Sequence, residues 1–175
     1  MRVLVTVASK HGATEEIGAA LAHSLARRGH HVVQLPPQDV DAVAPYDAVI
    51  LGSGVYAGHW LQPAKDFAER LATTLAERPV WIFSSGPLGD PPKPAGDPVD
   101  VSHVSELVQP REHVVFAGRL DRAVLGFGER AIVAMVKAPY GDFRDWEVID
   151  AWADVIGSQL APVDAEVVSA DAVPA

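Results

Sequence analysis

Apolar side chains fill the N-terminal segment almost without interruption, and polar residues do not alternate with them. Residues 2–8 are rich in Val, which is typical of a strand covered on both faces, as in a parallel sheet. Ile17, Leu21 and Leu25 then recur at helical spacing, and Gly29 is placed to end the helix. The chain therefore begins with a buried strand, a short loop and an amphipathic helix.

The same alternation continues along most of the chain. Further strands are predicted at 31–35, 46–53, 79–84 and 113–118, and further helices at 63–77, 102–110 and 145–160. Alternating strands and helices indicate βαβ units with right-handed crossovers, and the strands are too few for an eight-stranded barrel. We predict an α/β fold, a doubly wound five-stranded parallel sheet with helices on both faces.

A single domain is expected over residues 1–161, because no linker or internal repeat interrupts the pattern. Residues 119–144 are extra to the minimal fold and form an insertion after the fifth strand. Residues 162–175 are small, acidic and poor in aromatics, which predicts a disordered tail.

Charge and composition narrow the functional classes. The chain of 175 residues has 14 Lys and Arg against 23 Asp and Glu, a net charge of −9, which is unsuited to nucleic-acid binding driven by counterion release. It contains no Cys, which excludes disulfides, iron–sulfur clusters and Cys nucleophiles, and no metal site is expected. No apolar run reaches the roughly 20 residues of a membrane span. We interpret the N-terminus as a strand rather than a signal sequence, and expect a cytoplasmic protein.

The loop after the first strand carries the residues that a phosphate group requires. Hydroxyls, a glycine and successive backbone N–H groups lie there at the positive end of a helix, in the sequence Ser9-Lys10-His11-Gly12-Ala13-Thr14. The alternative is a plain turn in which Ser9 or Thr14 caps the helix. The loop lacks the sequence patterns of a P-loop and of the dinucleotide fingerprint.

Two more glycine-containing loops follow the third and fourth strands. Glycines allow a ligand to approach the backbone closely, and aromatic side chains can flank a planar ring. The second loop reads Ser53-Gly54-Val55-Tyr56-Ala57-Gly58-His59-Trp60, and the third reads Ser84-Ser85-Gly86-Pro87-Leu88-Gly89-Asp90. The alternatives are that Tyr56 and Trp60 pack under the next helix and that the third loop is a flexible connector. Together the three loops indicate a planar cofactor that bears a phosphate.

The first loop resembles the phosphate-binding loop of flavodoxins, which has a hydroxyl-x-x-Gly-x-Thr pattern. His11 stands where flavodoxins more often carry Thr or Ser, so one hydroxyl is lost. The other two loops are similar to those that enclose the flavin ring in that family. The resemblance implies strand order 2-1-3-4-5 and an FMN cofactor contacted by residues of the three loops, namely Ser9, Lys10, His11, Gly12, Ala13, Thr14, Ser53, Gly54, Val55, Tyr56, Ala57, Gly58, Ser85, Gly86, Pro87 and Leu88.

A finer resemblance is to the menaquinone-dependent protoporphyrinogen oxidases. Residues 52–59 resemble their Gly-x-Ser-x-x-x-Gly-His segment, residues 116–120 resemble their fifth strand, and an insertion precedes a helix start at Asp145-Trp146-Glu147. This resemblance implies an FMN-dependent oxidoreductase that oxidises protoporphyrinogen and reduces a quinone. A flavodoxin-type electron carrier that docks redox partners, and a non-enzymatic FMN-binding domain, are the alternatives.

The insertion differs from the rest of the chain in charge. Residues 111–144 carry six Lys or Arg and four Asp or Glu, a balance of +2, which leaves −11 for the remainder. Basic residues among apolar ones favour an anionic or lipid-like partner, including peripheral contact with a membrane. The candidate substrate-binding residues are Arg122, Arg130 and Lys137. The alternative is a helix that packs its apolar stripe on the sheet and leaves its charges in solvent.

Other conspicuous residues have structural interpretations. Asp142 and Asp145 flank Arg144, which favours a salt bridge at a helix start over acid–base catalysis. No Ser/His/Asp catalytic arrangement is evident from the spacing.

Overall fold

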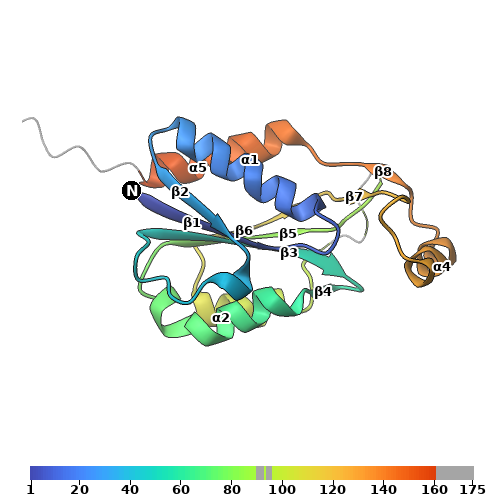
Figure 1. Ribbon diagram of the computed structural model, residues 1–175, viewed down its shortest axis with the longest axis horizontal. Helices are drawn as coiled ribbons and strands as arrows, with labels where there is room; N and C mark the ends of the chain where they lie inside the picture. Colours follow the sequence, from blue (N-terminus) through green and yellow to red (C-terminus); the bar gives the residue numbers. More distant parts are fainter. Residues whose placement is uncertain (90–92, 94–95, 161–175) are drawn as a thin grey trace, which may run out of the picture.

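Five parallel strands form the centre of the molecule in the computed structural model, which describes residues 1–89, 93 and 96–160 (Figure 1). They are β1 (Arg2–Ala8), β2 (His31–Leu35), β3 (Ala48–Tyr56), β5 (Val80–Ser85) and β6 (Glu112–Phe116). Their order is β2-β1-β3-β5-β6 and every neighbouring pair is parallel. The predicted fold and strand order are therefore confirmed. The expected tail at 162–175 lies outside the described residues.

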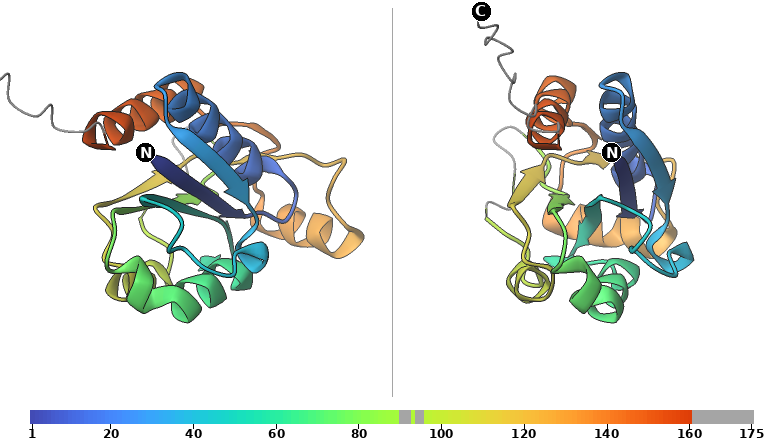
Figure 2. Two further views of the ribbon diagram at one scale, coloured as in Figure 1. Left: turned by 60° about the vertical axis from the view of Figure 1, so that its left-hand side comes forward. Right: turned by 90° about the vertical axis from the view of Figure 1, so that its left-hand side faces the viewer.

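Helices cover both faces of the sheet, as Figures 1 and 2 show. Helices α1 (Ala13–Arg27) and α5 (Trp146–Leu160) lie on one face, and α2 (Gln62–Leu75) and α3 (Val101–Val108) on the other, where the short helix η1 (Pro37–Asp39) also lies. Neighbouring residues of β1 enter different cores: Leu4 packs on the α2 side, and Val3 and Val5 on the α1 side. Both faces of the strand are buried, which explains why its sequence shows no polar alternation.

The second loop is a hairpin rather than an irregular loop. Strand β3 continues to Tyr56, and β4 (His59–Trp60) returns antiparallel to it. Ala57 and Gly58 form the turn with φ of 51° and 83°, the left-handed pair that suits a two-residue hairpin. The predicted end of the strand at residue 53 was therefore too early.

The insertion is a stalk that carries a helix. Strands β7 (Arg119–Leu120) and β8 (Gly141–Asp142) pair antiparallel, and α4 (Phe127–Val136) lies between them in sequence. Figures 1 and 2 show α4 projecting beyond the edge of the sheet. One alternative expected this helix to pack its apolar stripe on the sheet. Phe127 is 93% exposed and Met135 is 75% exposed, so that alternative is wrong.

No helix among the described residues is both long enough and apolar enough to cross a bilayer.

Candidate cofactor site at the carboxyl edge of the sheet

The three predicted loops meet around one cavity of about 350 Å³, at the carboxyl ends of β1, β3 and β5. This is the point where the strand order reverses, and open α/β sheets bind their ligands there. The volume falls within the range of small-molecule sites. Most of the predicted residues line it, namely Ser9, Lys10, His11, Ala13, Thr14, Gly54, Val55, Tyr56, Ala57, Ser85, Gly86 and Leu88. Their contacts with FMN stay a prediction.

Glycines allow these loops to lie close together. A Cβ built on Gly54 would stand only 3.1 Å from Oγ1 of Thr14. The first and second loops therefore lie too close together here for a larger residue. A Cβ on Gly118, just before the insertion, would stand 3.2 Å from the backbone Cα of Gly86. The side-chain-free backbone at these two positions therefore sets the separation between the walls of the cavity.

Four predicted residues lie outside the cavity lining and shape the loops instead. Gly58 forms the hairpin turn, and the buried hydroxyl of Ser53 donates to Gly54 O and accepts from Leu61 N. The carbonyl of Pro87 accepts a 2.7 Å hydrogen bond from Gly118 N. The last of the four, Gly12, belongs to the start of α1.

Helix α1 begins without a side-chain cap. Gly12 is its N-cap residue, with φ of 82°, and no side chain accepts a hydrogen bond at that position. Ser9 and Thr14 therefore do not cap the helix, as the plain-turn interpretation required. The first turn of α1 keeps N–H groups for an anion, and two hydroxyls lie beside them.

Two basic side chains of the first loop contact the insertion. Lys10 Nζ lies 2.6 Å and His11 Nε2 lies 2.9 Å from Oε1 of Glu129, a residue of α4. Hydrogen bonds from Lys10, from the backbone N–H of Gly126 and from His11 lower the pKa of Glu129 to about 2. The carboxylate is therefore ionised throughout the physiological range.

Tyr56 borders the same charged group. Lys10 Nζ lies 5.2 Å from the centre of its ring. Partial burial and, secondarily, the negative charge of Glu129 raise the pKa of Tyr56 to about 12. The phenol therefore stays neutral and presents an uncharged ring to the cavity.

Arg144 fixes the position of α1 relative to the stalk. Its guanidinium binds both carboxylate oxygens of Asp142, at 2.8 and 2.6 Å, and Nη1 donates to Glu16 Oε2 at 2.8 Å and to the carbonyl of Ala13 at 3.0 Å. The side chain is only 2% exposed. The predicted salt bridge is therefore present, and Asp145 accepts hydrogen bonds from the first backbone N–H groups of α5.

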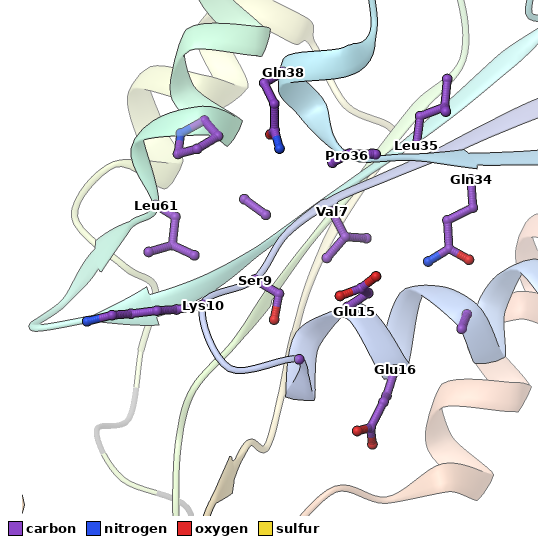
Figure 3. A pocket seen from close by; sticks show the side chains of 14 residues that line it. Val7, Ser9, Lys10, Glu15, Glu16, Gln34, Leu35, Pro36, Gln38 and Leu61 are labelled. Atoms are coloured by element: carbon purple, nitrogen blue, oxygen red, sulfur yellow. The ribbon is translucent and has the colours of Figure 1, made fainter. Parts of the chain in front are cut away.

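A larger hollow of about 840 Å³ lies on the other side of the first loop (Figure 3). It is bordered by Val7 at the end of β1, by Gln34 near the end of β2 and by Gln38, Glu15 and Glu16 (Figure 3). Only the first of the three loops reaches this hollow. It also lies beside β1 and β2 rather than at the reversal between β1 and β3, so the smaller cavity is the better flavin site.

A chain of polar contacts that runs from two buried side chains to the exposed Asp97 lies near the cavity and was not evident from the sequence. Trp60 Nε1 donates to Ser84 Oγ at 2.8 Å, Ser84 Oγ lies 2.9 Å from His113 Nε2, and His113 Nδ1 lies 3.3 Å from Asp97. This is the connectivity of a catalytic triad. Ser84 is fully buried, however, so its hydroxyl is inaccessible to a substrate and the chain joins β4, β5 and β6.

Trp60 and His59 both have structural roles. Trp60 is 2% exposed and packs in the core with Phe67 of α2, so of the two interpretations packing is correct. His59 Nδ1 lies 3.1 Å from Asp100, which also accepts a hydrogen bond from Trp60 N. No group of three or more His, Asp or Glu that could hold a metal ion occurs in the described part of the chain.

The insertion contributes different residues to the cavity from those predicted. Arg122, Arg130 and Lys137 are exposed and do not line it. The wall instead contains Arg119, which pairs with Glu16, together with Leu120, Leu125, Glu129, Ile132 and Val133. Substrate binding by the three exposed cations stays a prediction.

Sequence comparison identifies the family of the chain. Residues 4–146 match the model of the flavodoxin domain. The chain belongs to the flavodoxin-domain family. No match is found among the curated proteins.

Solved flavodoxins share the fold across nearly their whole length. Flavodoxin 1 from Bacillus cereus is 15% identical with a TM-score of 0.63, covering 92% of this chain and all of that one. A flavodoxin from the domain Archaea is 14% identical with a TM-score of 0.61, covering 91% and 98%. The rubredoxin:oxygen oxidoreductase of Desulfovibrio gigas, at 13% identity and a TM-score of 0.61, matches 90% of this chain through 35% of its own length.

Membership of the flavodoxin family implies FMN as the cofactor. The residues at the cavity fit this molecule. The uncapped start of α1 offers N–H groups, Ser9 and Thr14 offer hydroxyls and Lys10 offers a cation to a phosphate, while Tyr56 offers a neutral ring to a flavin.

Proposed function

We propose that the chain is a flavodoxin-type redox protein that binds FMN in the 350 Å³ cavity and transfers electrons to and from redox partners. The observation that carries the proposal is the meeting of three loops around one cavity, with an uncapped helix start at one end and a neutral aromatic ring within it. FMN supplies the redox chemistry when bound, and the protein supplies position and electrostatics.

Each wall has a distinct task in this proposal. Ser9, Thr14 and the first N–H groups of α1 hold the phosphate, and Tyr56 lies against the ring. Leu125 of the insertion, which is buried and lies outside α4, gives the flavin an apolar neighbour. Because the phenol of Tyr56 stays neutral below its pKa of about 12, it adds no negative charge when the flavin is reduced.

Flavin titration tests the assignment. We expect apo protein to bind FMN more tightly than riboflavin, and Thr14→Val to weaken FMN binding about tenfold, because a hydrogen bond to a charged group is lost. Riboflavin affinity should not change. Thr6→Val is the matched control, since the hydroxyl of Thr6 is buried in β1 and has no hydrogen-bond partner among the residues that the structure describes. Equal affinity of the wild type for FMN and riboflavin would contradict the phosphate site.

The insertion supports a second function: quinone-linked oxidation of protoporphyrinogen, with the protein at the membrane surface. The supporting observation is that α4 forms one wall of the cavity while its outer side exposes Phe127 and Met135. Reducing equivalents would leave the porphyrinogen for the flavin and then reduce the quinone to a quinol. Exposed cations beside an apolar helix face would attract propionates or anionic lipid.

Neutralising Arg122, Arg130 and Lys137 to Gln tests this second function. We expect turnover of protoporphyrinogen with a menaquinone analogue to fall while FMN affinity stays unchanged, because these side chains are exposed and do not line the cavity. A variant with Lys at the two Arg positions keeps the charge and serves as control. If the wild-type protein reduces no quinone but exchanges electrons with a reductase, the second function is refuted and only the carrier function is supported.

A further inference from the structure

Glu129 occupies the cationic end of the cavity with both carboxylate oxygens engaged. Oε1 contacts Lys10 and His11 at 2.6 and 2.9 Å, and Oε2 accepts a 2.8 Å hydrogen bond from the N–H of Gly126. Lys10 and His11 belong to the loop that is suited to a phosphate. The same two side chains therefore serve an anion of the protein itself.

This contact is the main polar attachment of α4. Among the described residues, Glu129 is the one side chain of α4 that makes a hydrogen bond or ion pair outside the insertion. None of the described side chains of α4 belongs to either hydrophobic core, and Phe127 and Met135 are largely exposed. Figure 1 and the left view of Figure 2 show the helix at one end of the molecule.

We propose that Glu129 is an internal competitor of the cofactor phosphate: its carboxylate holds α4 against the first loop, and a phosphate bound there displaces it and releases the helix. This inference rests on the proposed FMN site. A phosphate monoester carries close to two negative charges at neutral pH. Two anions that share Lys10 and His11 repel each other, so occupation by the phosphate weakens the contact with Glu129.

Release of α4 changes access to the cavity. Ile132 and Val133 of the same helix line its wall, so they move with Glu129. The base of the insertion stays in place, because Arg144 joins Asp142 of β8 to Glu16 of α1. Loading of the phosphate site would therefore open the flavin toward a partner or substrate on the α4 side.

Glu129→Gln tests whether the carboxylate competes with the phosphate for Lys10 and His11 or instead supports phosphate binding by these side chains. Gln can still accept the hydrogen bond from Gly126 at the start of the helix, but it lacks the negative charge. We expect FMN affinity to rise about two- to fivefold, the range for a partly exposed ion pair, and riboflavin affinity to stay constant. Asp121→Asn is the matched control, because it also removes a carboxylate from the insertion and retains an acceptor for the N–H of Ala123.

Hydrogen exchange over residues 127–136 measures the release directly. We expect faster exchange in apo Glu129→Gln than in apo wild type, and faster exchange in wild type after addition of FMN but not of riboflavin. Lys10→Met should also speed the exchange, while weakening FMN binding, because Lys10 serves both anions. Asp121→Asn should behave as the wild type.

Two results would overturn the inference. Weaker FMN binding by Glu129→Gln would show that the carboxylate supports Lys10 and His11 in binding the phosphate rather than competing for them. Unchanged FMN affinity together with unchanged exchange would show that the contact does not hold the helix. Should wild type fail to prefer FMN over riboflavin, the proposed cofactor site fails. Inorganic phosphate then replaces FMN as the probe, and a lack of faster exchange in wild type would refute the competition as well.

Discussion

Replacement of Arg144 by Met should destabilise the fold more than any exposed substitution in the insertion. Met keeps an unbranched apolar stem but loses the four hydrogen bonds of the guanidinium and its position 4.5 Å from the ring centre of Trp146. The side chain of Arg144 is almost completely buried, so in the variant no water takes the place of the guanidinium.

The expected loss follows from the exposure of each partner. The side chains of Asp142 and Glu16 are 41% and 47% exposed, so both carboxylates regain water and each ion pair contributes only about 0.5 kcal/mol. The bond from the charged donor to the carbonyl of Ala13 is worth about 1.5 kcal/mol, and the contact with the exposed ring of Trp146 about 0.5 kcal/mol. The total is roughly 3 kcal/mol, which lies at the lower end of the range for disrupted buried ion pairs.

Thermal and urea unfolding measure this loss. For a domain of this size, about 3 kcal/mol corresponds to a fall in Tm of roughly 6–12 °C. Arg122→Met is the control, because Arg122 lies exposed in the same insertion, and it should cost less than about 0.5 kcal/mol. If the two variants unfold at the same urea concentration, Arg144 does not anchor the stalk and the reasoning above is wrong.

Three further changes probe the loops and the polar chain. Gly12→Ala should cost about 1–2 kcal/mol in urea unfolding, because its φ of 82° is strained for Ala. The strain is the whole of this cost, because a Cβ built there meets nothing described within 4 Å; a cost near zero would mean that the loop relaxes. Gly118→Ala should lower FMN affinity in flavin titrations, because its Cβ would push against the backbone of Gly86 at 3.2 Å; unchanged affinity would show that the wall can yield. Burial lowers the pKa of His113, so the unfolded state binds more protons and stability falls as pH drops below the unfolded value of about 6.5 toward the folded pKa. His113→Gln should therefore lose less stability than wild type between pH 7 and 5 in urea titrations, and equal losses would exclude His113 as a source of the pH dependence.

The fold was predictable because its signals are local. The three central strands β1, β3 and β5 are buried on both faces, so each is a continuous run of mainly apolar residues in the sequence. The end of β3 was missed because Ala57-Gly58 is not a typical two-residue turn sequence, and Ala57 takes a left-handed conformation that few residues other than Gly adopt.

The site was predictable only in part. Loops after neighbouring parallel strands must share one edge of the sheet, so their meeting follows from topology. The contact of His11 with Glu129 joins residues 118 positions apart, and no periodicity or motif marks it. Amphipathic spacing in 127–136 likewise does not show which side of the helix faces the cavity, so the place of Glu129 in the cavity wall does not follow from the sequence.

The stalk makes the insertion an interchangeable module. Leu120 and Gly141 are directly paired across β7 and β8, and Phe143 N donates to Gly118 O just below them at 3.1 Å. A two-residue Asn-Gly turn can connect such a pair without disturbing the strands, and it would retain Arg119, Asp142 and Arg144. Excision of residues 121–140, or their exchange for a segment of different length, should therefore keep the hydrogen bond of Gly118 to Pro87 and the ion pairs of Arg144, while the first loop loses its contact with Glu129.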